Sequence, residues 1–402
     1  MHTPSHHDPI PAPAAPHTAE DLIRAVRAIS PVLRAEADAA ERDSRLTPEA
    51  ERALREAGLF RLGVPRSFGG HQLPLAAVLD VSAEVALTCP SSAWVAMVSY
   101  VAQQIAASFG EQACFDLWGT GPDTAMCGVF GGTDTSSEPV EGGVLVSGRW
   151  GWASGCHQAD WALLGVPLPR PGAAPERGLA LVRTADLTIE NTWDMAGMRG
   201  TGSDTLVGDA VFVPRHRLRP FADVTAGRGT AEEPLYRIPP GSMTLASMGP
   251  LLGAARAVFR LTMEAVDGGK PMAMSLHPRL ADSPGVQAAL ADAATLIDSA
   301  ALHLARSAEA VDAAAAMPGT APLVDRARVR MDGGHASRCL RDAVQLLLTV
   351  NGAGSFARGR LIQRYWHDLE TAARHPTLHP GLAREMYGRA LVGDTRPVSP
   401  MV

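Results

Sequence analysis

Cysteine is scarce in this 402-residue chain, which holds five cysteines and no CxxC pair. Their wide separation argues against both a disulfide framework and a zinc site, so no bound metal is expected. An excess of basic residues is also absent, because the formal net charge is −6. A nucleic-acid partner would need a basic face and is therefore not expected. We interpret the thiols as reduced and buried, which indicates a cytoplasmic protein.

The glycine-rich phosphate loops of nucleotide-binding proteins are absent as well. No GxGxxG follows a strand-like run and no Walker-type loop is present, so a Rossmann-type nicotinamide dinucleotide site is not expected. An uninterrupted long apolar run is also lacking. Residues 85–110 carry no charge, but proline, serine and glutamine interrupt them. Such groups are costly in lipid, so a buried helix beginning after "CPSS" is predicted in place of a membrane span.

The first 17 residues lack the cationic and apolar pattern of a signal peptide. Their proline and alanine content predicts a disordered tail over residues 1–17, because such a segment buries too little apolar surface to become ordered. Four histidines in the tail leave open the alternative that it binds a metal ion.

Three blocks of different character follow. Residues 18–121 have apolar residues at intervals of three and four, with Thr18 and Thr47 as expected N-caps, and predict an N-terminal helical domain. Residues 122–225 contain short alternating runs between glycines and prolines, which predict a central β domain. Residues 226–402 return to the helical period in long alanine-rich segments and predict a helical bundle. The expected fold class is therefore α+β.

Three stretches of the β block occur together: "MCGVFGGTDTSSEPV" (126–140), "GRWGWASGCHQADWALLGV" (148–166) and "WDMAGMRGTGSDTLVGDAVFVP" (193–214). In this order, between two helical blocks, they resemble the acyl-CoA dehydrogenase fold family. The resemblance covers about residues 18–392. It implies an N-terminal helical domain, a central β-barrel or sandwich, a C-terminal four-helix bundle and a flavin cofactor.

The residues that match the flavin-binding stretches have suitable chemistry. A tryptophan such as Trp152 can lie against the flat isoalloxazine ring. The polar edge of that ring and its N5 need hydrogen-bond partners, which the Ser154 hydroxyl and nearby main chain could supply. The other candidates for cofactor contact in this block are Met126, Cys127, Gly128, Arg199, Thr201 and Ser203. The alternative for the last three is a structural turn, because "RGTGSD" is also good turn chemistry.

An acyl-CoA dehydrogenase removes a proton beside a thioester carbonyl with a glutamate, which in many members follows an "RD" by about two helical turns. In the matching segment "RLIQRYWHDLETAARHPTLHP", counting on from Asp368 reaches Arg374 and His375. Glu370 is only two residues after Asp368 and is expected on another face of the helix. A carboxylate base is therefore missing where this reaction needs one.

A histidine at this place resembles the flavin-dependent two-component monooxygenases, a branch with the same fold. The resemblance implies that a separate NAD(P)H:flavin reductase supplies reduced flavin. That flavin reacts with O2 through a C4a-(hydro)peroxyflavin, and the oxygenase then hydroxylates a phenol, an amine or another small or polycyclic substrate. Motif matching places the catalytic roles on His375 and Ser154. The branch commonly has "WRD" where this chain has "WHD", so we expect any ion pair made by that arginine to be weakened here.

Alternatives to the catalytic role of His375 remain. A histidine before "P" also suits a helix C-terminus, where the dipole favours a cation. His379 and His157 are further candidates for the catalytic histidine. An acyl-CoA dehydrogenase with an atypical base is the alternative function, and a non-catalytic flavin-binding relative is a third.

The stretch "VNGAGSFARGR" resembles the glycine-rich loop that in this fold holds the flavin across a subunit boundary. Asn351, Gly352 and Ser355 are then contacts to a neighbouring subunit's cofactor, although "NGAG" is also a good interhelical turn. Lys270, with Arg256, is the candidate for the flavin phosphate. The family implies a homotetramer, a dimer of dimers assembled through the C-terminal bundle.

The substrate pocket is expected between residues 94–104 and 242–252, where apolar side chains are small or flexible. The candidate substrate contacts are Trp94, Met97, Met248 and His379. The sequence leaves open the choice between FMN and FAD, the substrate itself, and whether carbon, nitrogen or sulfur is oxygenated.

Overall fold

The computed structural model describes residues 18–227, 233–317 and 319–399. The tail expected over residues 1–17, with its histidines, lies outside the described residues. The first helices are α1 (Ala19–Asp43), α2 (Pro48–Glu56), α3 (Leu75–Ala86), α4 (Pro90–Ala106) and α5 (Glu111–Trp118). Strands occupy the middle of the chain, and helices return after Pro220. The expected α+β order of helical, β and helical blocks is confirmed.

Both expected N-caps are confirmed. The Thr18 hydroxyl accepts a hydrogen bond from the Asp21 N–H at 3.2 Å, and the Asp21 carboxylate accepts the Thr18 N–H at 2.9 Å. The Thr47 hydroxyl accepts the Ala50 N–H at 3.2 Å ahead of Pro48. Each cap pairs a backbone donor that has no partner inside the helix, so the local sequence fixes where α1 and α2 begin.

The β domain is a sandwich of two four-stranded sheets. One sheet has the order β1 (Met126–Val129), β4 (Trp161–Arg170), β5 (Ala173–Arg183) and β8 (Leu218–Pro220). The other has the order β2 (Thr133–Val140), β3 (Gly143–Trp150), β7 (Thr205–Pro214) and β6 (Thr188–Glu190). Apolar side chains from both sheets, among them Trp150, Leu164 and Leu206, form the core between them. The alternating runs in the sequence reflect this arrangement, since one face of each strand is buried.

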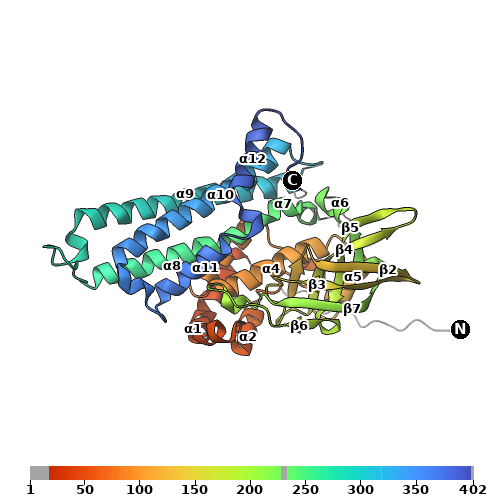
Figure 1. The fold of residues 1–402 in the computed structure, drawn as a ribbon, viewed down its shortest axis with the longest axis horizontal. Helices are drawn as coiled ribbons and strands as arrows, with labels where there is room; N and C mark the ends of the chain where they lie inside the picture. Colours follow the sequence, from red (N-terminus) through yellow and green to blue (C-terminus); the bar gives the residue numbers. More distant parts are fainter. Residues whose placement is uncertain (1–17, 228–232, 318, 400–402) are drawn as a thin grey trace.

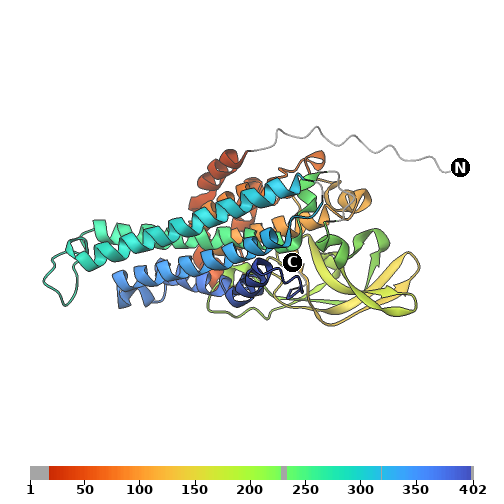
Figure 2. The same cartoon turned by 90° about the horizontal axis from the view of Figure 1, so that it is seen from above.

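The C-terminal helices form the expected four-helix bundle. Its members are α8 (Met248–Asp267), α9 (Pro284–Ala315), α10 (Leu323–Asn351) and α11 (Leu361–Ala372). The bundle extends to one side of the molecule and the two sheets lie at the other, with α4 between them (Figure 1). The view from above shows the same separation of bundle and sheets (Figure 2). Helix α12 (Pro380–Leu391) packs on α10.

The first and last helical blocks share one hydrophobic core. A single cluster of buried residues includes Leu22 of α1 and extends through α3, α4, α8 and α10 to Leu378. Helix α3 packs so closely on α8 that a Cβ atom at Gly253 would lie 2.1 Å from the Ala83 carbonyl oxygen. The predicted boundaries at residues 121 and 225 therefore divide the sequence into blocks. They do not divide the hydrophobic core, because the two helical blocks share one interior.

The buried helix predicted after "CPSS" is α4, which begins at Pro90 within that motif, and nearly all of its residues are buried. Among the described helices, α9 is long and apolar enough to cross a membrane when judged by length and composition alone. Its most apolar stretch is 22% buried, so most of that stretch faces outward in a single chain.

Candidate active site

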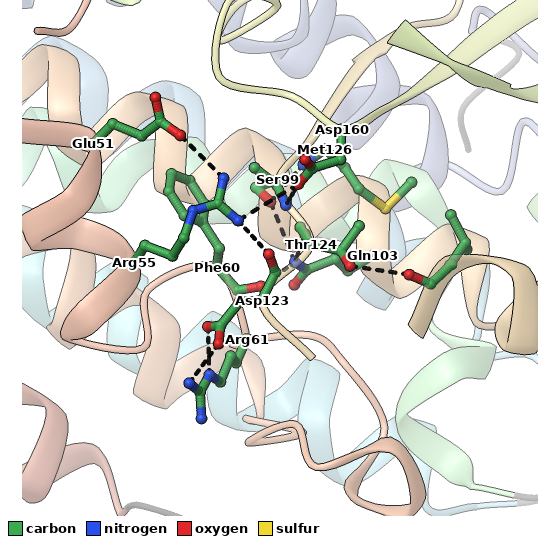
Figure 3. Close-up of polar contacts among 12 residues, drawn as sticks. Glu51, Arg55, Phe60, Arg61, Ser99, Gln103, Asp123, Thr124, Met126 and Asp160 are labelled. Atoms are coloured by element: carbon green, nitrogen blue, oxygen red, sulfur yellow. Dashed lines mark hydrogen bonds and ion pairs between the residues drawn. The ribbon is translucent and has the colours of Figure 1, made fainter. Parts of the chain in front are cut away.

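Helix α4 is the element that joins the helical part to the β domain, through two polar residues one turn apart. The buried Gln103 amide donates to the carbonyl oxygens of Phe60 at 2.7 Å and Thr124 at 3.0 Å. The Ser99 hydroxyl accepts the Met126 N–H at 3.0 Å (Figure 3). The first residue of β1 is therefore tied directly to α4.

Charged residues complete this junction. Arg55 lies 3.5 Å from the Asp160 carboxylate, which accepts the Ala125 N–H at 2.9 Å. Arg61 pairs with Asp123 through both carboxylate oxygens (Figure 3). These contacts bind the segment that enters β1 to α2 and to the turn before β4, so the sheet edge is held against the helices.

The two tryptophans of the "GRWGWASG" stretch have different surroundings. Trp150 is fully buried in the sandwich and donates from Nε1 to the Gly165 carbonyl oxygen at 2.9 Å. Trp152 is 67% exposed, has a left-handed φ of +66°, and meets the Trp193 ring edge-on at 5.2 Å. A large indole held outward in an unfavourable backbone conformation indicates a binding surface.

A chain of hydroxyl groups lies beside Trp152. The Trp94 Nε1–H donates to Ser154 Oγ at 3.1 Å, and Ser154 Oγ lies 2.7 Å from Ser203 Oγ. Ser203 Oγ is 2.6 Å from Thr201 Oγ1, which donates to the Met198 carbonyl oxygen at 2.8 Å. Four residues predicted for the site, from three separate parts of the sequence, are therefore brought together by the fold.

His375 extends this group. Its ring meets the Trp94 ring edge-on, with 5.7 Å between the ring centroids. Its Nδ1 lies 2.7 Å from Thr377 Oγ1 and accepts the Thr377 N–H at 3.4 Å. His375 is an exposed residue, yet desolvation of its ring by the surrounding protein, with a further contribution from the Arg330 charge, lowers the pKa of His375 to about 4. The imidazole is therefore neutral near pH 7.

The expected alternative for His375 was a cap at the end of a helix. Helix α11 ends at Ala372, and His375 is not its cap; its side chain instead caps the start of the short helical turn Pro376–Leu378. Because Nδ1 accepts a backbone N–H in the neutral ring, the proton of the imidazole is on Nε2. Glu370, predicted on another face of α11, pairs with Arg341 of α10 at 3.1 Å.

The loop that carries Thr201 and Ser203 is anchored on α11. The Met198 N–H donates to the carboxylate of Asp368, which is buried. A Cβ atom at Gly197 would lie 2.1 Å from the His367 carbonyl oxygen, so the loop and the helix approach closely. Burial, with a further contribution from the Glu41 charge, raises the pKa of Asp368 to about 7.

Asp204 also fixes this loop, a role that no sequence motif predicts. Its carboxylate accepts the Thr192 N–H at 2.6 Å and the Trp193 N–H at 2.8 Å, and lies 2.7 Å from His157 Nε2. His157, one of the candidate catalytic histidines, is thus engaged in supporting the loop. Arg199 donates to the Glu41 carbonyl oxygen at 2.8 Å. This contact fits the alternative in which Arg199 has a structural role in the turn.

The first two side chains of β1 lie in the protein interior. Met126 and Cys127 are buried, and burial raises the pKa of the Cys127 thiol. Strand β1 forms the edge of its sheet and pairs on one side with β4. Any contact of Met126, Cys127 or Gly128 with a cofactor would therefore come from the main chain.

The candidates for phosphate and cross-subunit contacts lie elsewhere in the chain. Lys270 Nζ donates to the Asn351 carbonyl oxygen at 2.7 Å, and Ser355 Oγ donates to the Gly352 carbonyl oxygen at 2.6 Å. These residues lie at or just after the C-terminal ends of α8 and α10, at the end of the bundle away from the sheets (Figure 1). Arg256 is more than two helical turns before the end of α8, so it and Lys270 do not hold one phosphate together.

The remaining substrate candidates divide into two kinds. Met97 and Met248 are buried in the shared core, beside other residues of α4 and α8. His379 is exposed and caps α12, because its Nδ1 accepts the Leu382 N–H at 3.1 Å. Of the four candidates, Trp94 is the one in contact with the Ser154 and His375 group.

These residues fit a flavin. Trp152 offers an outward-facing aromatic surface, and Ser154 offers a hydroxyl beside it that belongs to a hydrogen-bonded chain. The neutral His375 faces the same group across Trp94. A flavin bound there would supply the reaction with O2, and these side chains would orient it and hold a proton donor nearby.

Comparison with known proteins gives the class. Residues 18–116 match the family described as "Acyl-CoA dehydrogenase, N-terminal domain". Residues 245–380 match the family described as "Acyl-CoA dehydrogenase, C-terminal domain". XiaF from a Streptomyces species, solved with FADH2 and glycerol, has a TM-score of 0.90 at 30% identity and covers 96% of this chain and 98% of its own. The fold is therefore that of the acyl-CoA dehydrogenases.

Sequence relatives place the chain more closely. The oxygenase component of the FADH(2)-dependent resorcinol hydroxylase of a Rhizobium species is 32% identical, over 96% of this chain and 97% of its own. The flavin-dependent monooxygenase oxygenase subunit HsaA of Rhodococcus jostii is 31% identical, over 91% and 97%. The chain belongs to the oxygenase components of two-component flavin-dependent monooxygenases. It uses reduced flavin, supplied by a separate reductase, and O2; the alternative of an acyl-CoA dehydrogenase is not supported.

Proposed function

We propose that the reduced flavin lies against Trp152 with its N5 at Ser154, and that His375 faces the reacting substrate. The arrangement of Trp152, Ser154 and His375 carries this proposal, because it places an aromatic surface, a hydroxyl and a neutral imidazole near one another. The buried Trp94 contacts both Ser154 and His375. FADH2 is the proposed flavin, since both the resorcinol hydroxylase and the XiaF complex name it. The main chain of Met126–Gly128 would hold the polar edge of the ring.

The proposed substrate is a hydroxylated aromatic compound. Names of the relatives support this class, among them resorcinol hydroxylase and p-hydroxyphenylacetate 3-hydroxylase. A neutral imidazole with its proton on Nε2 can donate to a substrate oxygen at pH 7 without carrying a charge of its own. Trp94 would contact the aromatic ring of the substrate on the side of α4.

The assembly and the location of the protein are proposed as well. We propose a homotetramer in which Asn351, Gly352, Ser355 and Lys270 of one subunit contact the cofactor of a neighbour. Their separation from Trp152 within one chain supports this, because they could reach a flavin only across a subunit boundary. The reductase is proposed to use NAD(P)H. Five free and buried cysteines support a cytoplasmic location.

Rapid mixing tests the proposed function. Protein loaded anaerobically with FADH2 is mixed with O2 and followed for a transient near-ultraviolet absorbance that precedes oxidised flavin. Reoxidation at the rate of free FADH2, with no transient, would contradict the proposed role of the site.

Histidine variants test the assignment of the catalytic group. With resorcinol and 4-hydroxyphenylacetate as probe substrates, we expect His375→Ala to lower product formation by about 10²- to 10⁴-fold, because it removes the proton donor. FADH2 affinity should change by less than about threefold. His379→Ala is measured in parallel. A larger loss in His379→Ala than in His375→Ala would move the catalytic role to His379.

A further inference from the structure

The hydroxyl chain between Trp94 and Met198 has a fixed direction. At one end stands an indole N–H, which can only donate. At the other end stands the Met198 carbonyl oxygen, which can only accept. Three hydroxyl groups lie between these ends, and each has a single proton to donate.

The proton positions follow from the two ends. Thr201 donates to the Met198 carbonyl oxygen at 2.8 Å, so its proton is used there. The contact of 2.6 Å between Thr201 and Ser203 then requires Ser203 to donate. The contact of 2.7 Å between Ser203 and Ser154 requires Ser154 to donate in turn. Ser154 therefore gives its proton inward and accepts the Trp94 N–H.

Burial keeps the chain in this direction. Thr201 and Ser203 are 0% and 3% exposed, so water does not offer them other partners. Reversal would place two oxygen lone pairs against each other at the Met198 carbonyl. Ser154 is partly exposed, and the one hydrogen-bonding position it has left is a lone pair. Toward the binding surface, Ser154 is an acceptor.

We infer that Thr201 and Ser203 set the polarity of Ser154 so that the site selects flavin carrying a proton on N5. This inference rests on the proposed contact between Ser154 and N5. Reduced flavin has an N5–H, which can donate to the Ser154 lone pair. Oxidised flavin has only a lone pair at N5, which faces the lone pair of Ser154. The site thus favours the form that a reductase delivers and releases the form that must return to it.

Thr201 and Ser203 act here as positioning residues, since neither reaches the surface. The readout is the ratio of the dissociation constants of oxidised and reduced FAD, measured anaerobically by calorimetry with dithionite-reduced FAD for the reduced form. In the wild type the ratio should exceed one. In Thr201→Val, of nearly equal shape, and in Ser203→Ala, Ser154 can turn its proton outward. We expect the ratio to fall by about three- to tenfold in both variants.

Controls separate polarity from structure. Thr201→Ser keeps the hydroxyl and should keep the wild-type ratio, whereas a packing defect would affect it as well. Should Thr201→Val fail to fold, Ser203→Ala alone decides. An unchanged ratio in the folded variants, or a wild-type ratio near one, would overturn the inference. Ser154→Ala distinguishes failure of this inference from failure of the proposed contact between Ser154 and N5. If it lowers the ratio while Thr201→Val and Ser203→Ala do not, the inference fails and the contact to N5 stands. If it has no effect, both fail.

Discussion

Asp368 shows how one buried carboxyl group can connect a helix to a binding loop. It lies on α11, close to the site. The contacts described above for Trp152 and Ser154 do not include Asp368. Its contact is the Met198 N–H, and the Met198 carbonyl oxygen is the end of the hydroxyl chain. The position of the loop thus depends on a group whose raised pKa makes it sensitive to pH.

Replacing this carboxyl should change how stability depends on pH. The pKa of Asp368 is about 7 against an ordinary value of 3.8, so the folded chain holds this proton more tightly than the unfolded chain. Its contribution is full below about pH 4 and is lost as pH rises through 7. In Asp368→Asn, which keeps an acceptor for Met198, the free energy of unfolding relative to wild type should rise by on the order of 2–4 kcal/mol from acid to pH 8.

Urea unfolding at a series of pH values measures this difference. Asp209→Asn, at an exposed position of β7, controls for the loss of one negative charge. Parallel curves for wild type and Asp368→Asn would show that the carboxyl titrates normally.

Single residues differed in how far the sequence could predict them. Trp152, Ser154 and His375 were predicted as site residues by resemblance, because their motifs are local. Met198 and Asp204 were not, since their roles depend on a left-handed φ of +56° and on backbone donors that only the folded loop presents. The direction of the hydroxyl chain could not be predicted either, because it depends on which hydroxyl contacts a carbonyl oxygen in the folded loop.

Helix α4 is the element on which both halves of the site depend. Its first turns carry Trp94, and Ser99 and Gln103 hold the start of β1. Gln103→Leu would leave Phe60 and Thr124 carbonyl oxygens and the Gly63 N–H unpaired in the interior. We expect a loss of about 3 kcal/mol in the free energy of unfolding.

Urea titration of the same variant provides the measurement. Gln112→Leu, at an exposed position of α5, should change stability by less than about 0.5 kcal/mol. A loss below about 1 kcal/mol in Gln103→Leu would contradict this expectation. It would mean that the backbone groups at the junction find other hydrogen-bond partners.

The contact between the binding loop and α11 gives a second test at this scale. Gly197→Ala places a methyl group against the His367 carbonyl oxygen, so the loop must move away from the helix. We expect a loss of about 1–3 kcal/mol in stability and weaker FADH2 binding. Gly388→Ala in α12 meets no atom within 4 Å and should be neutral or stabilising by up to about 1 kcal/mol. Equal FADH2 affinity in the two variants would argue against the loop's role.

At the level of elements, the sequence predicted most of the helices and strands. Caps such as Thr18 and Thr47, and alternation in β3 and β4, are local signals with local causes. The parallel pairing of β1 with β4 was not predicted. It joins segments separated by two other strands, and no residue pattern within β1 encodes which neighbour it takes.

The outward face of α9 is the surface through which the proposed tetramer would assemble. Leu302 is 71% exposed in one chain, on a helix whose apolar stretch is mostly unburied. Apolar surface of this kind is costly in water, and a second copy of the bundle would cover it. We expect wild type to elute as a tetramer and Leu302→Glu to dissociate into smaller species in light-scattering measurements. Leu391→Glu, 61% exposed on α12, is the matched control and should leave the tetramer intact.

The interior common to α3 and α8 has a consequence for how the chain is made. A ribosome completes α3 at Ala86 long before it reaches the end of α10 at Asn351. At about 5–20 residues per second, the early helices wait on the order of ten seconds or more for the partners that cover them. Nascent chains of this protein should therefore need a chaperone during synthesis, and fragments ending before the last helices should be degraded or insoluble.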